Sequence, residues 1–417
     1  MSTETIGVAP WMALPETQAV IAALEARGSP GCARFVGGCV RNTLMGKPID
    51  DIDIATTLTP DAVIEALGQA KLRAIPTGVD HGTVTAVSNG RPYEITTLRR
   101  DVSTDGRRAV VAFTQDWSED AQRRDFRFNA LYVDIHGRLY DPTGEGVNDA
   151  REGRVVFVGD PTTRIREDSL RILRFFRFHA WYGRGDPDQE ALAACKALIG
   201  LAEGLAAERV QKELLKLLAA DDPRATVRLM AATGVLSRVL PSVESPARFE
   251  GLVAIETEQL FENDPELRLA ALLPDDPKIA EQVAERLRLS NALKARLIAA
   301  AGASPRIVSW MSPREIRRVV YDLGLNTFSD RVKLAWAASG RSATTPQWRG
   351  LLALAETWTP PAFPLTGEEV LKAGAPKGPM VGEVMREVET WWIDQDFIED
   401  KFSIIERLKA VVQGMAF

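Results

Sequence analysis

The segment FVGGCVRN at residues 35–42 and the segment DDIDI at residues 50–54 decide the fold of the first part of this chain. A β-branched run, a pair of glycines and a helical run predict a strand, a tight turn and a helix that follows Gly38. The second segment predicts another strand. Alternate side chains of a strand share one face, so Asp51 and Asp53 should project together.

These two aspartates predict a metal site. Neighbouring carboxylates repel each other unless a cation neutralises them, and oxygen ligands on a rigid strand suit Mg²⁺. The glycines allow a phosphate to approach backbone N–H groups, and Arg41 follows closely enough to hold the charge of that phosphate. Each piece alone is also typical of ordinary structure, because glycine pairs mostly serve turns and aspartates mostly face solvent.

Outward from this segment the pattern is mixed at first and helical later. Short β-branched runs between turns fill residues 33–140, with a hairpin expected over residues 136–137. A further helix is expected at residues 60–67, with Thr59 as its N-cap. After Gly159 the strands stop, and amphipathic helical runs divided by glycine and proline follow. The predicted fold class is therefore α+β.

Composition limits the class of protein. The chain has 417 residues, of which 45% are hydrophobic and 26% charged, which excludes a disordered or fibrous protein. No apolar run is long enough to span a membrane, and the first residues lack a signal-peptide pattern, so a cytoplasmic location is expected. The three cysteines form no CxxC pair, which argues against disulfides and structural zinc.

The net charge of −6 excludes a globally basic surface, so a nucleic-acid partner needs a local basic patch. One stretch is rich enough in arginine to supply it, through Arg164, Arg166, Arg171, Arg174, Arg177 and Arg184.

Two further motifs carry charge beside apolar residues. The first is RRDFRFNA at residues 123–130, and the second is RIREDSLRILRFFRF at residues 164–178. If the second is one continuous helix, Glu167, Arg171 and Arg174 share a stripe and Asp168 neighbours Arg171. An exposed helix with ordinary ion pairs is the alternative, but the apolar residues between the charges favour a half-buried helix beside a cleft.

Taken together, these motifs resemble the bacterial, class II CCA-adding tRNA nucleotidyltransferases and the related bacterial poly(A) polymerases. GGCVRN with DIDIATTLTP, RRDF, DPTGEG and REDSLRILRFFRF stand in the order of that family. The resemblance is strong over residues 33–241 and looser for GAPKGPMVG in the tail. It implies a DNA polymerase β-like nucleotidyltransferase head, with a mixed sheet of about five strands, followed by an all-α neck, body and tail.

The resemblance also implies domain boundaries and partners. The head should occupy residues 1–145, the neck with the nucleotide-recognition helix residues 146–241, and the tRNA-binding body and tail residues 242–345 and 346–417. The partners implied are the 3′ end of tRNA, ATP and CTP, with Mg²⁺ as cofactor. We expect no membrane contact and no obligate protein partner.

Roles carry over to matching positions only. Gly38 and Arg41 should touch the triphosphate, and Asp51 and Asp53 should hold the metal and be catalytic. Asp125 is counted with the catalytic residues, and with Arg124 should contact phosphate and ribose. The base and triphosphate pocket is expected to be lined by Asp168, Arg171, Arg174 and Arg177. A third metal-facing carboxylate is left open between Asp125 and Glu94.

The sequence departs from the family pattern at two places. Asn42 replaces the aspartate that ends GGxVRD, so orienting Arg41 suits it better than a metal role. Arg127 and Phe128 stand where smaller residues are typical, and the sequence gives no reason for them. The polar stretch at residues 101–108 is expected to be a mobile loop, which is either an inert insertion or an aid to the change from C to A addition.

The expected activity is addition or repair of the tRNA CCA end from CTP and ATP, with pyrophosphate released. C and A both present an exocyclic amine beside an unprotonated ring nitrogen, so the Asp168 carboxylate and the Arg171 guanidinium can read them as a protein template. Three alternatives stay open: a poly(A) polymerase, a partial CC-adding or A-adding enzyme, and a non-catalytic RNA-binding module.

Overall fold

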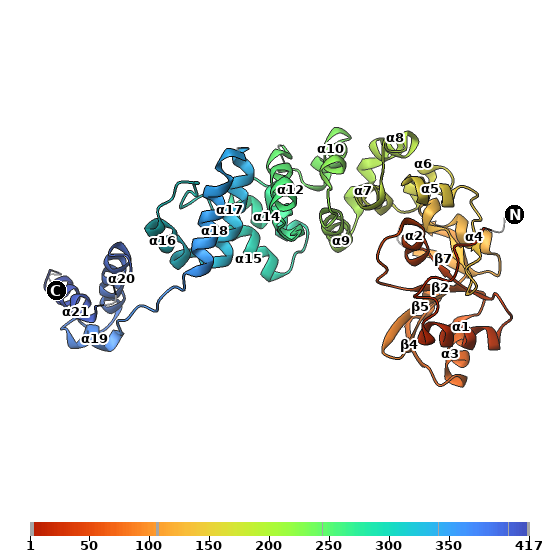
Figure 1. Cartoon of the computed structure of the whole chain (residues 1–417), viewed down its shortest axis with the longest axis horizontal. Coiled ribbons are helices and arrows are strands. Elements are labelled where there is room, and N and C mark those ends of the chain that lie inside the picture. Colours follow the sequence, from red (N-terminus) through yellow and green to blue (C-terminus); the bar gives the residue numbers. More distant parts are fainter. Residues whose placement is uncertain (1–3, 106–107, 244, 341, 399, 415–417) are drawn as a thin grey trace. The chain divides into compact units, whose positions relative to one another are not determined.

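The computed structural model describes residues 4–105, 108–243, 245–340, 342–398 and 400–414. Strands are confined to the N-terminal part, and helices make up the rest (Figure 1). The chain divides into two compact units. The first unit comprises residues 1–243 with 286–288, and the second comprises residues 244–285 with 289–417.

A seven-stranded mixed sheet, two strands wider than expected, forms the centre of the N-terminal part. Its order is β3-β4-β5-β2-β1-β8-β9, and β2 and β5 run parallel while the other neighbouring pairs are antiparallel. The strands are β1 (Ala33–Val36), β2 (Asp53–Thr56), β3 (Arg73–Gly78), β4 (Thr83–Ser88), β5 (Arg91–Thr97), β8 (Tyr132–Val133) and β9 (Leu139–Tyr140). The sequence pattern missed β3 because Pro76 interrupts it, and an edge strand tolerates that proline.

A separate two-stranded sheet replaces the loop expected at residues 101–108. It pairs β6 (Arg99–Asp105) with β7 (Arg108–Phe113), so that expectation was wrong for the strand residues. Residues 106 and 107 of that expectation lie outside the described part of the chain.

Local sequence explains the helices that flank the sheet, which are α1 (Pro15–Arg27), α2 (Gly38–Met45) and α3 (Pro60–Gln69). Gly37 ends β1 with a φ of 71°, which favours glycine, and α2 begins at the next residue. The predicted N-cap of α3 is confirmed, since the Thr59 hydroxyl accepts a hydrogen bond from the Ala62 N–H at 3.4 Å. Figure 1 shows α1 and α3 lying together in the red and orange part of the chain, where they contact each other.

The remaining helices of the first unit follow the sheet. They are α4 (Trp117–Gln122), α5 (Gly146–Glu152), α6 (Pro161–Glu167), α7 (Leu170–Tyr182), α8 (Gln189–Leu198), α9 (Ala207–Leu218), α10 (Arg224–Ala232) and α11 (Val235–Val239), with short 3₁₀ turns at Val79–His81, Arg127–Asn129 and Ile199–Gly204.

The expectation of one continuous helix over residues 164–178 was wrong. The chain is extended at Asp168, with φ −149° and ψ 103°, and this residue separates α6 from α7. The Asp168 carboxylate accepts a hydrogen bond from the Leu170 N–H at 3.1 Å. Aspartate and serine favour such helix starts because their side chains compete with the backbone for hydrogen bonds.

The two residues that the sequence left unexplained have structural roles in this unit. Phe128 is fully buried and contacts the rings of Phe126, Phe178 and Tyr182, at centroid distances of 5.9, 5.6 and 6.1 Å. Arg127 Nε donates to the buried carboxylate of Asp149 at 2.7 Å. Both departures therefore serve the packing between the sheet and α7.

The second unit is helical in its described residues. Its helices are α12 (Ala247–Gln259), α13 (Pro265–Leu272), α14 (Pro277–Arg286), α15 (Asn291–Ala300), α16 (Pro313–Leu323), α17 (Leu325–Ser339), α18 (Thr345–Thr357), α19 (Gly367–Lys372), α20 (Pro379–Asp394) and α21 (Lys401–Gly414), with a 3₁₀ turn at Ser342–Thr344. The last residues of α14 belong to the first unit. No helix in the described part of the chain is long and apolar enough to cross a membrane.

Candidate active site

A cluster of carboxylates lies where β2 and β5 run side by side. Asp53 is the first residue of β2 and stands in register with Glu94 on β5, while Asp51 lies two residues before the strand. The isoleucines on either side of Asp53, Ile52 and Ile54, are buried, so the predicted alternation is confirmed around it. Burial, with the charges of Glu94 and Asp51, raises the pKa of Asp53 to about 6.

The raised pKa shows that this position is short of positive charge. Arg124 and Arg41 act in the opposite direction without cancelling the effect. A divalent cation would relieve the repulsion, and carboxylate oxygens are the ligands that such ions prefer. Among the described residues no three histidine, cysteine, aspartate or glutamate side chains are grouped to hold a metal by themselves. The residues therefore fit an ion that also takes ligands from substrate or water.

The two candidates for a third metal-facing carboxylate have different surroundings. Glu94 is exposed, and its charge acts on Asp53. Asp125 is 8% exposed, and its oxygens accept from the Phe126 N–H at 2.8 Å, from Asn129 Nδ2 at 3.0 Å and from Arg174 Nε at 2.7 Å. Burial alone would raise the pKa of Asp125, but Arg174 outweighs it and lowers that pKa to about 2.

Arg41, expected at the triphosphate, is buried behind the glycine turn. Its Nε and Nη2 atoms donate to Asn42 Oδ1 at 3.2 and 3.0 Å, so the expectation that Asn42 orients Arg41 is confirmed. Its Nη1 donates to Asn129 Oδ1 at 2.5 Å, and its Nη2 to the Tyr182 hydroxyl at 2.8 Å. The guanidinium also lies 4.0 Å from the centre of the Tyr182 ring.

Arg124 is held beside the same turn by a buried carboxylate. Its Nε and Nη2 atoms donate to Asp120 Oδ2 at 3.2 and 3.0 Å, and Asp120 is 1% exposed. The Tyr132 hydroxyl donates to the same oxygen at 2.7 Å. A Cβ added at Gly37 would lie 3.9 Å from Arg124 Nη1, so this arginine reaches the glycine turn.

One hydrogen-bonded network joins the glycine turn to the helix α7. Arg41 donates to Asn129, Asn129 donates to Asp125, and Arg174 of α7 donates to the other oxygen of Asp125. We call these four residues the Asn129 network. It ties α2 to α7 through side chains that are at least two-thirds buried, so movement of one helix is felt by the other.

The break between α6 and α7 holds the expected base-reading pair. Asp168 Oδ2 accepts from Arg209 Nη2 of α9 at 2.8 Å, and the Asp168 side chain is 30% exposed. Arg171 Nη1 donates to Glu167 Oε2 at 2.6 Å, and its Nη2 donates to the Arg123 carbonyl at 3.0 Å. Asp168 and Arg171 thus share one junction, but each is engaged by protein groups in this structure.

The arginine-rich stretch is less exposed than its composition indicated. Of its six arginines, Arg166 and Arg184 are exposed, and the other four are partly buried. Arg177 pairs with Glu213 of α9, Nε to Oε2 at 2.6 Å, and Arg164 pairs with Glu167 at 2.5 Å. Most of this charge is therefore used inside the first unit.

Sequence reasoning missed the residues that hold the expected ones. They are Asp120, Asn129, Tyr182, Arg209 and Glu213. A signal existed for two of them, because the four-residue spacing of Arg209 and Glu213 puts both on one face of the helix AERVQKELLKLL. Asp120 gave none, since a single acid ahead of two arginines is also typical of solvated surface.

Comparison with known proteins gives matches over most of the chain. The model described as "Poly A polymerase head domain" matches residues 33–156, and "Probable RNA and SrmB- binding site of polymerase A" matches residues 186–245. The mouse protein named "CCA tRNA nucleotidyltransferase 1, mitochondrial" is 32% identical over 387 residues, which cover 90% of this chain and 86% of that protein. The "CCA-adding enzyme" of Streptococcus gordonii is 30% identical, covering 90% and 93%.

Solved structures agree in fold. The crystal structure of the Bacillus stearothermophilus CCA-adding enzyme in complex with CTP superposes with a TM-score of 0.76 at 26% identity, covering 95% of this chain and 96% of that one. The Thermotoga maritima CCA-adding enzyme complexed with tRNA_CCA superposes with a TM-score of 0.69 at 22% identity, covering 97% and 98%, and shows the fold alone.

Proposed function

Because the chain belongs to the family of CCA-adding tRNA nucleotidyltransferases, we propose that it builds or repairs the 3′-terminal CCA of tRNA from CTP and ATP. Pyrophosphate is the second product. The observation that carries the proposal is the carboxylate cluster of Asp51, Asp53 and Glu94, with Arg41 and Arg124 close enough to act on the Asp53 charge. Nucleotidyl transfer needs both a site for divalent cations and positive charge for the triphosphate.

The family uses divalent metal ions, and we propose Mg²⁺ held by Asp51 and Asp53. When bound, such an ion lowers the pKa of the attacking hydroxyl and neutralises charge on the phosphates. Glu94 suits the third position better than Asp125, whose oxygens already accept bonds from Arg174, Asn129 and a backbone N–H. Asp125 then acts as a positioning residue for Arg174.

The other expected site residues have proposed roles in binding. Gly38 begins α2, where backbone N–H groups can hold a phosphate, and Arg41 and Arg124 supply positive charge behind it. Arg174 and Arg177, fixed by Asp125 and Glu213, extend this charge along α7. The chain itself then does most of its work by positioning and charge stabilisation.

Base selection is proposed for Asp168 and Arg171 at the junction of α6 and α7. C and A offer an amine to the carboxylate and a ring nitrogen to the guanidinium, whereas U and G reverse both polarities. In this structure Arg209 donates to Asp168, and Glu167 and the Arg123 carbonyl accept from Arg171. An incoming base must therefore replace these protein partners, which rewards only a base of matching polarity.

The four expected domains remain part of the proposal. The boundary between the two compact units falls after Val243, close to the expected start of the body. Head and neck would then share the first unit, and body and tail the second, where we propose that tRNA is gripped. The cytoplasmic location also remains a prediction.

A poly(A) polymerase is the second candidate, because the matching head model carries that description. Incubating tRNA that lacks all three terminal nucleotides with CTP, with ATP and with both, followed by sequencing of the products, separates the possibilities. The proposal expects CC from CTP alone and CCA from both. Long A tails would identify a poly(A) polymerase, and a product that stops at CC or needs a CC end would identify a partial enzyme.

A further inference from the structure

The second unit contains a pocket of about 630 Å³ that the proposed reaction does not use. It lies among the segment between α15 and α16, the helices α17 and α18, and the turn before α14. Its volume falls in the range of sites for small organic molecules, which is about 300–1,000 Å³. The two ends of the pocket differ in chemistry.

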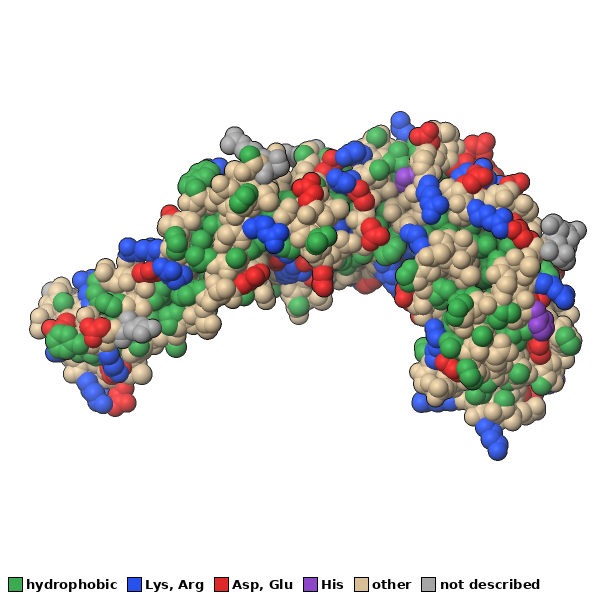
Figure 2. Space-filling view, in the orientation of Figure 1, with side chains coloured by type: hydrophobic (Ala, Val, Ile, Leu, Met, Phe, Trp, Pro, Cys, Tyr) green, Lys and Arg blue, Asp and Glu red, His purple; other side chains and the backbone are tan. Residues whose placement is uncertain are grey.

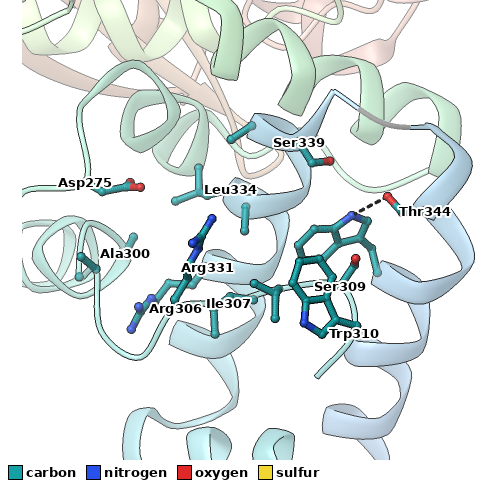
Figure 3. Close-up of a pocket in the computed structure, with 16 residues that line it drawn as sticks. Asp275, Ala300, Arg306, Ile307, Ser309, Trp310, Arg331, Leu334, Ser339 and Thr344 are labelled. Atoms are coloured by element: carbon teal, nitrogen blue, oxygen red, sulfur yellow. Dashed lines mark hydrogen bonds between the residues drawn. The ribbon is translucent and has the colours of Figure 1, made fainter. Parts of the chain in front are cut away.

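One end is cationic. Figure 3 shows the side chains of Arg306, Arg331 and Asp275 on the same side of the pocket. Arg331 is 6% exposed, and its Nη1 and Nη2 atoms donate to the carbonyls of Ser304 and Pro305 at 2.9 and 2.6 Å. Neither it nor Arg306 forms an ion pair with another described residue. The Asp275 carboxylate already pairs with Arg248, so positive charge prevails at this end.

The other end is aromatic and lined with hydroxyl groups. Trp310 is 78% exposed although it lines a pocket, and Ser309, Ser339 and Thr344 lie at the same end (Figure 3). An indole that is left uncovered in this way offers a stacking surface. Ala335 and Ala338 of α17 line the wall, and their short side chains leave room for a flat ring.

From this arrangement we propose that the pocket binds a nucleoside phosphate, with the base against Trp310 and the phosphate between Arg306 and Arg331. A planar ring joined to an anion matches the aromatic and cationic ends together, whereas a simple anion would leave the indole uncovered. The hydroxyl groups supply donors and acceptors for base or ribose. The nucleotide can be free or a unit of an RNA strand, since both present the same chemistry. This inference does not depend on the chemistry of the head.

The test measures binding of AMP to the full chain by equilibrium dialysis, without divalent cation and with saturating CTP to fill the proposed head site. We expect one remaining AMP site, weakened about tenfold or more in both Trp310→Ala and Arg306→Ala. The matched controls are Phe402→Ala, another exposed aromatic residue, and Arg314→Ala, another exposed arginine, and both should bind like wild type.

Comparison of ligands identifies the source of the nucleotide. Ribose 5-phosphate and adenosine, which each lack one half of the ligand, should bind much more weakly than AMP. If a short single-stranded RNA binds at least tenfold more tightly than AMP and loses this gain in Trp310→Ala, the natural occupant is RNA. If it binds no better, the occupant is a free nucleotide. Absence of a second AMP site, or equal binding by the pocket variants and controls, would overturn the proposal while leaving CCA addition untouched.

Discussion

At the scale of single residues, Asp53 carries an energetic cost that its function explains. Its pKa of about 6, above the ordinary 3.8, means that the folded chain binds this proton more tightly than the unfolded chain. Stability therefore falls as pH rises from about 4 to about 6, and the full penalty persists at pH 7. We expect Asp53→Asn to lose nucleotide transfer by more than about 100-fold while the metal-free variant unfolds at a higher temperature than wild type at pH 7.

Thermal unfolding with and without Mg²⁺ checks this prediction. The metal should raise the midpoint of wild type and leave that of Asp53→Asn unchanged, because only the wild type loses charge repulsion on binding. Asp50→Asn, at a neighbouring exposed carboxylate, is the control and should respond like wild type. An Asp53→Asn variant that retains transfer within tenfold of wild type would refute the metal assignment.

Asp168 is predicted to control specificity as well as rate. Removing its carboxylate in Asp168→Ala takes away both the acceptor for the amine of C and A and the clash with the carbonyl of U and G. The ratio of CTP to UTP incorporated on one tRNA should fall by about tenfold or more, measured with all four triphosphates in competition.

Arg209→Ala separates base reading from a structural ion pair, because it breaks the contact to Asp168 and keeps the carboxylate. This variant should keep the discrimination of wild type. If the two variants lose stability equally and both leave the CTP to UTP ratio unchanged, Asp168 does not read the base.

At the scale of elements, the Asn129 network couples the helix behind the glycine turn to α7. Asn129→Ala removes the acceptor of a buried Arg41 N–H and a donor to Asp125. We expect unfolding in urea to show a loss of about 1–3 kcal/mol, since each buried group is left without its partner. Asn148→Ala, which removes an exposed bond to Glu145, should cost less than about 0.5 kcal/mol. Equal small losses in both variants would show that the network does not tie the helices together.

The contact of α4 with the glycine turn should depend on pH. Burial alone would raise the pKa of Asp120, but Arg124 and Arg123 outweigh it and lower that pKa to about 2. A lowered pKa stabilises the fold above about pH 4, and this stabilisation is lost as pH falls towards 2.

Asp120→Asn should therefore lose about 3 kcal/mol at neutral pH and show a weaker dependence of stability on acid than wild type. Unfolding in urea between pH 7 and pH 3 measures both effects. Asp80→Asn, at an exposed carboxylate, should follow the wild-type curve throughout.

Most elements could be predicted from the sequence, and most of their connections could not. The strands β1 and β2 and the helices at Gly38 and Pro60 follow from local pattern and capping residues. The break at Asp168 did not, because helical spacing of charges continues across it and only the backbone at one residue departs. Partners such as Asp120 and Asn129 belong to contacts set by packing, which local pattern does not record.

At the scale of the whole molecule, net charge says little about nucleic-acid binding. Positive and negative side chains are interspersed on the face that Figure 2 shows. We expect affinity for tRNA to fall steeply between about 50 and about 200 mM salt, in proportion to the phosphates contacted, despite the net charge of −6. Filter binding across this range measures the slope, and a dissociation constant that does not change would contradict a local electrostatic interface.

The central position of β2 in its sheet has a consequence for how this enzyme could change over generations. Asp53 stands on a strand paired on both sides, by β1 and β5, so substitutions there disturb neighbours that every reaction needs. Asp168 occupies a bend between two helices and has one exposed face. Laboratory selection for a different terminal nucleotide should therefore accumulate changes around that bend, while the strand stays as it is and the chemistry is inherited intact.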